Sequence, residues 1–261
     1  MGAEDVTRLL WTRSGARRIP PTRALDAALG RLAKGELFRI CEFDPRGPLY
    51  LLPTREMIRA LAARIRACGA RRILEVAAGD GFLSAALRPA LPGTRIVASD
   101  SGAWADHGAR MTAAERREFR GVSVPGVRLG DSVLRLDALA AIRRTRPELV
   151  LASWLPPGGL LERLIRAPVL YVLEIGAKGG VTPGAWSWRF AHEFCEEVER
   201  NARCRLDERP RRELHSRVTL YYGARHPEHA RERVRPGDWL WQFRPPRSCS
   251  DSRSPPRSRT W

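Results

Sequence analysis

The chain has 261 residues, of which 43% are hydrophobic and 29% are charged. A chain of this length can form one or two domains with a substantial buried core. It contains no run of about 18 consecutive apolar residues, so the sequence predicts no membrane span. The five cysteines are scattered, odd in number and free of any C-x-x-C pair, which is typical of reduced thiols and predicts a cytoplasmic protein.

The formal net charge of +17 makes nucleic acid a candidate partner. All but two of the 46 basic residues are arginines, the exceptions being Lys34 and Lys178. Such a bias is typical of a GC-rich coding sequence whatever the protein does. The sequence has no basic run interleaved with aromatic residues and no recognisable RNA- or DNA-binding motif. We therefore favour a solvated arginine surface over nucleic-acid binding.

The first 53 residues are predicted to form a helical extension. Apolar residues recur mostly at helical spacing from Asp5 to Lys34, and Gly35 is the predicted stop. The range Phe43–Pro53 contains Asp-Pro and Gly-Pro breaks and is predicted to be a connector. Thr54 then has the position of a helix N-cap and opens the next domain.

Strands and helices alternate after this point. The helices are predicted at 83–88, 138–144, 160–166 and 186–203, and the short apolar strands at 72–78, 94–99, 133–136, 148–153, 169–175 and 217–222. This alternation predicts an α/β fold with a doubly wound, mostly parallel sheet. The domain is expected to span residues 54–243, because residues 244–261 are rich in Arg, Ser and Pro and are predicted to be a disordered tail.

The most informative segment is Ile73–Leu83, in which a predicted strand runs into a glycine turn and then a helix. Small residues let the backbone approach a ligand closely, and the helix start offers unpaired N–H groups. A nucleotide-like ligand is therefore expected at this turn. The dinucleotide fingerprint G-x-G-x-x-G would align with Gly79 and Gly81, but its third glycine falls on Ser84.

Two carboxylates near the turn, those of Glu75 and Asp80, would repel a pyrophosphate and favour a cationic ligand. The segment resembles the first motif of the class I S-adenosylmethionine-dependent methyltransferases, an acidic strand residue followed by x-G-x-G-x-G. Glu75, Gly79 and Gly81 match it, and Ala77 stands where the family has its first glycine. The resemblance covers about residues 54–222. It implies a seven-stranded sheet with S-adenosylmethionine as the cofactor, whose sulfonium and amino groups are cations.

The resemblance implies further roles at the ends of the second and third strands. Asp100 stands where the family has an acidic residue that accepts both ribose hydroxyls, and Ser101 lies beside it. Asp137 and Ala138 resemble the third motif, in which a carboxylate accepts the adenine amino group and the next backbone N–H meets the ring. Asp131 is a rival for this role, and both aspartates could instead be helix caps.

The fourth predicted strand ends in S-W-L-P-P, residues 153–157. In this family the carboxyl end of that strand faces the transferred methyl group, as the rule for open α/β sheets also predicts. Ser153 and Trp154 are therefore expected at the cofactor, although Trp154 could instead pack under the loop. The prolines do not stand next to Ser153 as they do in amine-directed members, so no amine acceptor is inferred.

The resemblance thus implies a methyltransferase with an unidentified, small-molecule acceptor. In-line methyl transfer depends on alignment more than on an acid or base, so no catalytic residue is assigned. No metal is expected, because His192, Cys195 and Cys204 lack zinc-type spacing. The alternatives are a methyltransferase of RNA or protein, a nonenzymatic protein that binds an adenosyl ligand, and an NAD-dependent oxidoreductase.

Overall fold

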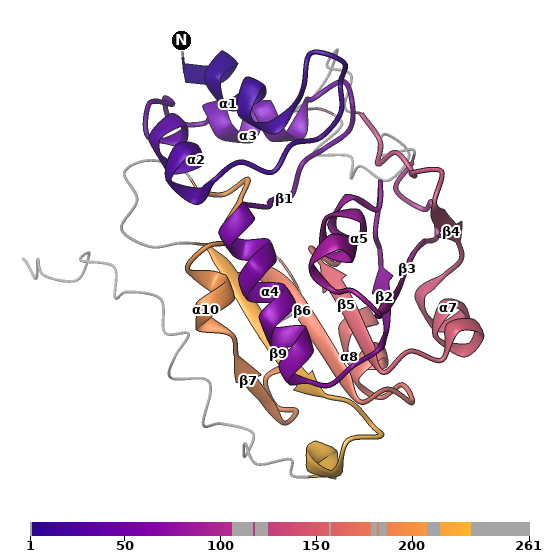
Figure 1. The fold of residues 1–261 in the computed structure, drawn as a ribbon. Helices are drawn as coiled ribbons and strands as arrows, with labels where there is room; N and C mark the ends of the chain where they lie inside the picture. The colour runs from indigo at the N-terminus through magenta and orange to yellow at the C-terminus, as the bar shows by residue number, and fades with distance from the viewer. Residues whose placement is uncertain are drawn as a thin grey trace, which may run out of the picture.

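The computed structural model describes residues 2–105, 117, 125–156, 158–178, 182, 187–207 and 215–230. Figure 1 shows their arrangement. The predicted tail at residues 244–261 and the predicted domain end at residue 243 lie outside these ranges. None of the helices within them has the length and apolar character that crossing a membrane requires.

A seven-stranded sheet forms the centre of the molecule, in the order β4-β3-β2-β5-β6-β9-β7. Its strands are β2 (Arg72–Val76), β3 (Arg95–Asp100), β4 (Val133–Arg135), β5 (Leu149–Ser153), β6 (Tyr171–Ala177), β7 (His192–Phe194) and β9 (Ser216–Tyr222). The pairs from β4 to β6 are parallel, and β9 runs antiparallel to both β6 and β7. The predicted doubly wound, mostly parallel sheet is confirmed, and all six predicted strands are present.

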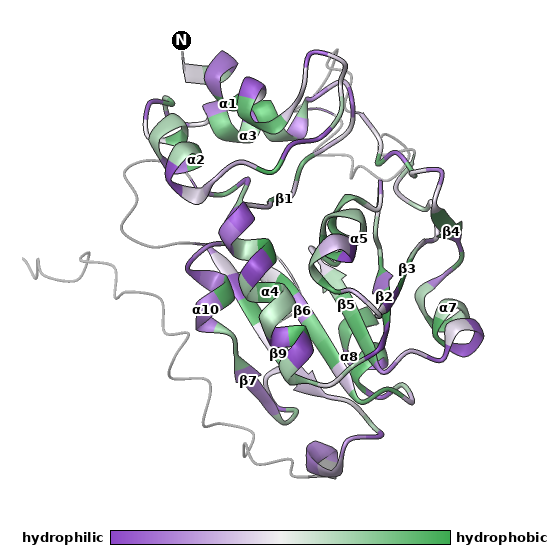
Figure 2. Cartoon of the chain, in the orientation of Figure 1, coloured by the Kyte–Doolittle hydropathy of each residue, from purple (hydrophilic) through white to green (hydrophobic). Residues whose placement is uncertain are grey.

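Helices cover both faces of the sheet. On one face, α4 (Arg55–Ala67) and α5 (Phe82–Leu87) pack against Leu149 and Leu151 of β5. On the other face, α7 (Ala138–Thr145) and α8 (Leu160–Ile165) pack against Val150 and Ala152 of the same strand. Since both faces of β5 are buried, the strand is apolar at each of these positions, and it is green in Figure 2.

The predicted helix over 186–203 is wrong. The described part of this range contains β7, the short helix α10 (Glu196–Glu199) and Arg203 of β8 (Arg203–Cys204). β7 pairs with β9, and His192 lies opposite Tyr221 with ring centroids 5.8 Å apart. Cross-strand ring contacts stabilise such a pair, and pairing with a later strand overrides the helical spacing.

The N-terminal extension contains α1 (Gly2–Leu10), α2 (Thr22–Leu29) and α3 (Glu36–Glu42), which lie together at one end of the molecule (Figure 1). Their apolar side chains form a small hydrophobic cluster of their own, which includes Val6, Leu25 and Leu37. The predicted helix stop at Gly35 is wrong. Gly35 has a left-handed φ of 79° and begins α3 instead of ending a helix.

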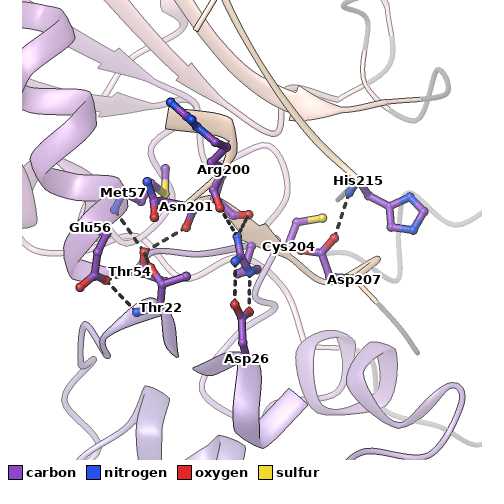
Figure 3. A network of polar contacts seen from close by, with 12 residues as sticks. Thr22, Asp26, Thr54, Glu56, Met57, Arg200, Asn201, Cys204, Asp207 and His215 are labelled. Atoms are coloured by element: carbon purple, nitrogen blue, oxygen red, sulfur yellow. Dashed lines mark hydrogen bonds and ion pairs between the residues drawn. The ribbon is translucent and has the colours of Figure 1, made fainter. Parts of the chain in front are cut away.

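Polar contacts fasten the extension to the sheet domain (Figure 3). The strand β1 (Leu51–Leu52) pairs antiparallel with β8. The side chain of Arg203 in β8 is only 6% exposed, and it donates two hydrogen bonds of 2.6 and 2.8 Å to the carboxylate of Asp26 in α2. The Thr54 hydroxyl donates to the carbonyl of Asn201 at 3.0 Å and accepts the N–H of Met57, which caps α4 as predicted. The extension is therefore fixed in position over the end of the sheet.

We predict that Asp26→Ala lowers the free energy of unfolding by about 2 kcal/mol, because it leaves the buried Arg203 guanidinium without two charge-assisted bonds. The measurement is urea denaturation. Asp5→Ala is the matched control, since it breaks only a surface pair with Arg31 and should cost less than about 1 kcal/mol. Equal losses in the two variants would contradict the role of Asp26.

Candidate functional site

A cavity of about 430 Å³ lies at the carboxyl ends of β2, β3 and β5. Along the chain, β3 is added beside β2 and β4 beside β3, and β5 then pairs with the other side of β2. Open α/β sheets bind ligands at such a switch point, outside the carboxyl ends of the strands. The volume falls within the roughly 300–1,000 Å³ of ordinary small-molecule sites. The cavity is therefore the candidate functional site.

Most of the predicted cofactor residues line this cavity. The residues on its wall are Glu75, Ala77, Gly79, Asp80, Asp100, Ser153 and Trp154. Four others do not belong to the lining: Gly81, Ser101, Asp137 and Ala138. The structure thus brings together the loop after β2 and the ends of β3 and β5, but not the start of α7.

The loop after β2 takes its shape from three residues with left-handed backbone. They are Ala77 (φ 51°), Gly79 (φ 54°) and Gly81 (φ 72°). A Cβ added at Gly81 would lie 2.8 Å from Cγ2 of Val133 in β4, so this glycine is required for packing although it is not on the cavity wall. Asp80 accepts the N–H of Phe82 at 3.0 Å, which satisfies a free donor at the start of α5.

We predict that Ala77→Gly stabilises the protein by up to about 1 kcal/mol. Glycine relieves the left-handed strain of an alanine, worth about 1–2 kcal/mol, and loses about 0.4–1 kcal/mol through a more flexible unfolded chain. Ala78→Gly is the control, because Ala78 does not have positive φ; it should destabilise by about 0.5–1 kcal/mol. Urea denaturation of both variants tests this, and an equal destabilisation would be the contrary result.

Glu75 is a buried carboxyl at the cavity, with 2% of its surface exposed. Its Oε2 accepts the N–H of Ser84 at 2.9 Å. Burial raises the pKa of Glu75 to about 7, and the carboxyl makes no ion pair with any described residue. A cation bound beside it would favour the ionised form and lower this pKa. Glu75 is thus suited to hold a positively charged group of a ligand.

Asp100 joins the end of β3 to the glycine loop. Its Oδ2 accepts the N–H of Gly79 at 3.0 Å, and its Oδ1 accepts the N–H of Gly102 at 2.8 Å. Each carboxylate oxygen has two lone pairs, so Asp100 can still accept hydrogen bonds from a ligand in the cavity. Ser101 instead makes a local turn, in which its Oγ accepts the N–H of Ala103 at 3.2 Å.

Asp137 caps α7. Its Oδ1 accepts the N–H groups of Leu139 and Ala140, each at 3.0 Å. This is the helix cap that the sequence left open as the alternative, and the contact with adenine stays a prediction. Its rival Asp131 is also absent from the cavity lining, where Val127 and Arg128 supply this part of the wall.

Aromatic side chains form the part of the cavity wall near the end of β5. The rings of Trp154 and Tyr50 are stacked, with centroids 6.0 Å apart and planes at 22°. The guanidinium of Arg205 lies 4.7 Å from the Tyr50 ring and forms an ion pair with Glu42. Phe38 adds a third ring on the cavity wall. Trp154 lies on the cavity wall and its side chain also packs against the hydrophobic core, so the structure favours neither of its two predicted roles over the other.

The N-terminal extension supplies one side of the cavity. Trp11, Arg17, Phe38, Glu42 and the segment 46–51 all belong to the lining. Sequence reasoning missed every one of these residues, as it missed Arg205, because no local motif marks them. The tertiary contacts between the extension and the sheet domain bring them to the site.

These residues also change the charge expected of the site, since the cavity is not uniformly acidic. Arg17 pairs with Asp80 at 3.0 Å, and Arg205 pairs with Glu42. Within the described residues, Glu75 and Asp100 are the lining carboxylates without an ion pair. Any attraction for a cationic ligand is therefore concentrated at these two side chains.

The strand order and the reversed β9 define an α/β fold of the class I methyltransferase type. No protein-family model and no curated protein sequence matches the chain. Similar solved structures include a putative caffeoyl-CoA O-methyltransferase from Staphylococcus aureus, with 9% identity over 77% of this chain and 98% of that chain and a TM-score of 0.41. The 23S rRNA methyltransferase ErmE has 16% identity over 68% and 71% of the two chains and a TM-score of 0.35.

A third similar structure is the plantazolicin methyltransferase BpumL in complex with SAH, with 8% identity over 64% of this chain and 82% of that chain and a TM-score of 0.36. The names of these three proteins indicate different acceptors. Likeness at such low identity concerns the fold, and it assigns no acceptor to this chain.

Proposed function

We propose that the chain binds S-adenosylmethionine in this cavity and transfers its methyl group to a small molecule. One observation carries the proposal: the cavity at the switch point is bounded by the left-handed glycine loop and by two carboxylates, Glu75 and Asp100, that form no ion pair with any described residue. The cofactor has cationic sulfonium and amino groups and two ribose hydroxyls. Carboxylates are suitable partners for both kinds of group.

The residues present fit this cofactor. The backbone from Ala77 to Gly79 is open to close approach, because no side chain there is larger than a methyl group. Asp100 has lone pairs left for the ribose hydroxyls, and the buried Glu75 can hold the amino group in its ionised form. Asp137 lies outside the cavity lining, so the proposal does not rest on its contact with adenine.

When bound, the cofactor supplies a methyl group activated by the sulfonium charge. This chain would contribute alignment, since holding two reactants in contact can supply about 7–11 kcal/mol of a barrier. Ser153 and Trp154 at the carboxyl end of β5 stand where an acceptor would meet the methyl group. The side chains of the extension would exclude water from this end of the cavity.

The aromatic wall supports a small, partly apolar acceptor. Phe38, Tyr50 and Trp154 present ring surface to the cavity, and small-molecule sites are typically lined in this way with a few polar groups between the rings. Glu42 and Arg205 are polar groups beside these rings.

A thermal-shift comparison of S-adenosylmethionine, S-adenosylhomocysteine and NAD tests the cofactor. A ligand at about 100 times its dissociation constant adds roughly 2.7 kcal/mol, which raises the melting temperature of a chain of this size by about 5–10 °C. We expect this shift from both adenosyl compounds and none from NAD. A shift with NAD alone would favour an oxidoreductase and contradict the proposal.

We predict that Asp100→Ala abolishes the shift by S-adenosylhomocysteine, because the ribose hydroxyls lose their acceptor. The variant also loses two internal hydrogen bonds, so the ligand-induced shift is measured against the ligand-free variant and the affinity is checked by calorimetry. Asp5→Ala in α1 is the control, because Asp5 does not line the cavity, and it should keep the full shift. An intact shift in Asp100→Ala would show that the ribose assignment is wrong.

A further inference from the structure

Arg17 belongs to the N-terminal extension and lies beside the glycine loop that follows β2. Its Nη1 donates to Asp80 Oδ2 at 3.0 Å, and its guanidinium carbon lies 4.1 Å from the centre of the Phe82 ring and 5.3 Å from that of Trp11. The side chain is 14% exposed and lines the cavity. Arg17 thus places a nearly buried positive charge beside the loop that the proposed cofactor would contact.

A tight turn holds Arg17 in this position. Trp11 and Arg17 face each other in an antiparallel bridge, and the N–H of Thr12 donates to the carbonyl of Ala16 at 2.8 Å. Gly15, with a φ of 83°, closes the turn between them. The turn continues directly from α1, so the position of Arg17 is set by the folded extension.

The other arginines of the cavity wall bond to groups outside the glycine loop. Arg46 makes two hydrogen bonds to Asp44, and Arg128 donates to the carbonyl of Pro45. Arg205 is paired with Glu42 among the aromatic rings. Among these four arginines, Arg17 is the one that bonds to Asp80 in the glycine loop and lies over the Phe82 ring at the start of α5.

The guanidinium of Arg17 is incompletely satisfied. Its buried Nε has no hydrogen-bond partner among the described residues, and its one carboxylate partner, Asp80, is 43% exposed. Burial lowers the pKa of Arg17 against the opposing effect of Asp80. A guanidinium has five donors in a planar fork that matches a carboxylate, and Asp80 accepts from Nη1 alone, so a second carboxylate that reaches the guanidinium from the cavity would find a further donor.

We propose that Arg17 binds the α-carboxylate of the cofactor's amino-acid end. The inference rests on the proposed function, which gives partners to the amino group and the ribose of the cofactor but leaves this anion without one. Glu75 takes the amino group and Arg17 takes the carboxylate, so opposite ends of the zwitterion meet opposite charges. The N-terminal extension then forms part of the cofactor site itself.

Two ligands that differ by one group test this assignment. S-adenosylhomocysteine carries the carboxylate, and S-adenosyl-3-thiopropylamine is the same molecule without it. Dissociation constants of both are measured by calorimetry for the full chain and for Arg17→Gln. We expect the substitution to weaken S-adenosylhomocysteine about tenfold or more, as loss of a charge-assisted pair implies, and to leave the amine unchanged or bound more tightly.

Two further variants complete the design. Arg18→Gln is the matched control: it removes the same charge from the next residue, an exposed side chain that donates to the carbonyl of Arg8 and does not line the cavity. It should keep both affinities. Arg17→Lys keeps the charge but not the planar fork, so it serves if Arg17→Gln fails to fold. Its loss should be smaller and again confined to S-adenosylhomocysteine.

The outcomes separate the two proposals. Equal weakening of both ligands would mean that Arg17 only supports the loop through Asp80, and no weakening of either would mean that it does not touch the ligand; both results overturn the assignment. If the unaltered chain binds neither adenosyl compound, the proposed function fails and the assignment falls with it.

Discussion

The site depends on one local constraint, the left-handed turn that follows β2. Three residues with positive φ, Ala77, Gly79 and Gly81, take the chain sharply from the strand into α5. The Asp100 carboxylate holds this turn from the neighbouring strand by accepting the N–H of Gly79. Since parallel strands end at the same edge of a sheet, this bond ties two strand ends together and leaves a cavity between the loop and β5. The same turn packs Gly81 against Val133 and lies beside the carboxylates of Glu75 and Asp100 at the cavity.

The second contribution comes from outside the sheet. The extension is fixed by the pairing of β1 with β8 and by the bond between Arg203 and Asp26. Arg205 directly follows β8 and forms an ion pair with Glu42 in α3. The contacts at β8 that hold the extension therefore also place Arg205 beside the aromatic wall. The extension therefore belongs to the site, because it supplies Arg17 and Phe38 to the cavity lining.

Much of the sheet could be predicted from the sequence, because buried parallel strands are short apolar runs and the glycine loop is a local signal. Glu75 and Asp100 could be placed for the same reason, since each has a fixed position relative to its strand. The strand β7 could not be predicted, because its residues have a helical pattern and become a strand only by pairing with β9. Arg17 and Trp11 carry no local signal, and only the folding of the extension brings them to the loop.

The most direct test is a crystal structure of the chain grown with S-adenosylhomocysteine. The account predicts electron density for the ligand in the cavity between β2 and β5, with its ribose hydroxyls on Asp100 and its amino group near Glu75. Density elsewhere on the molecule, or a cavity closed by protein atoms when the ligand is in large excess, would contradict it.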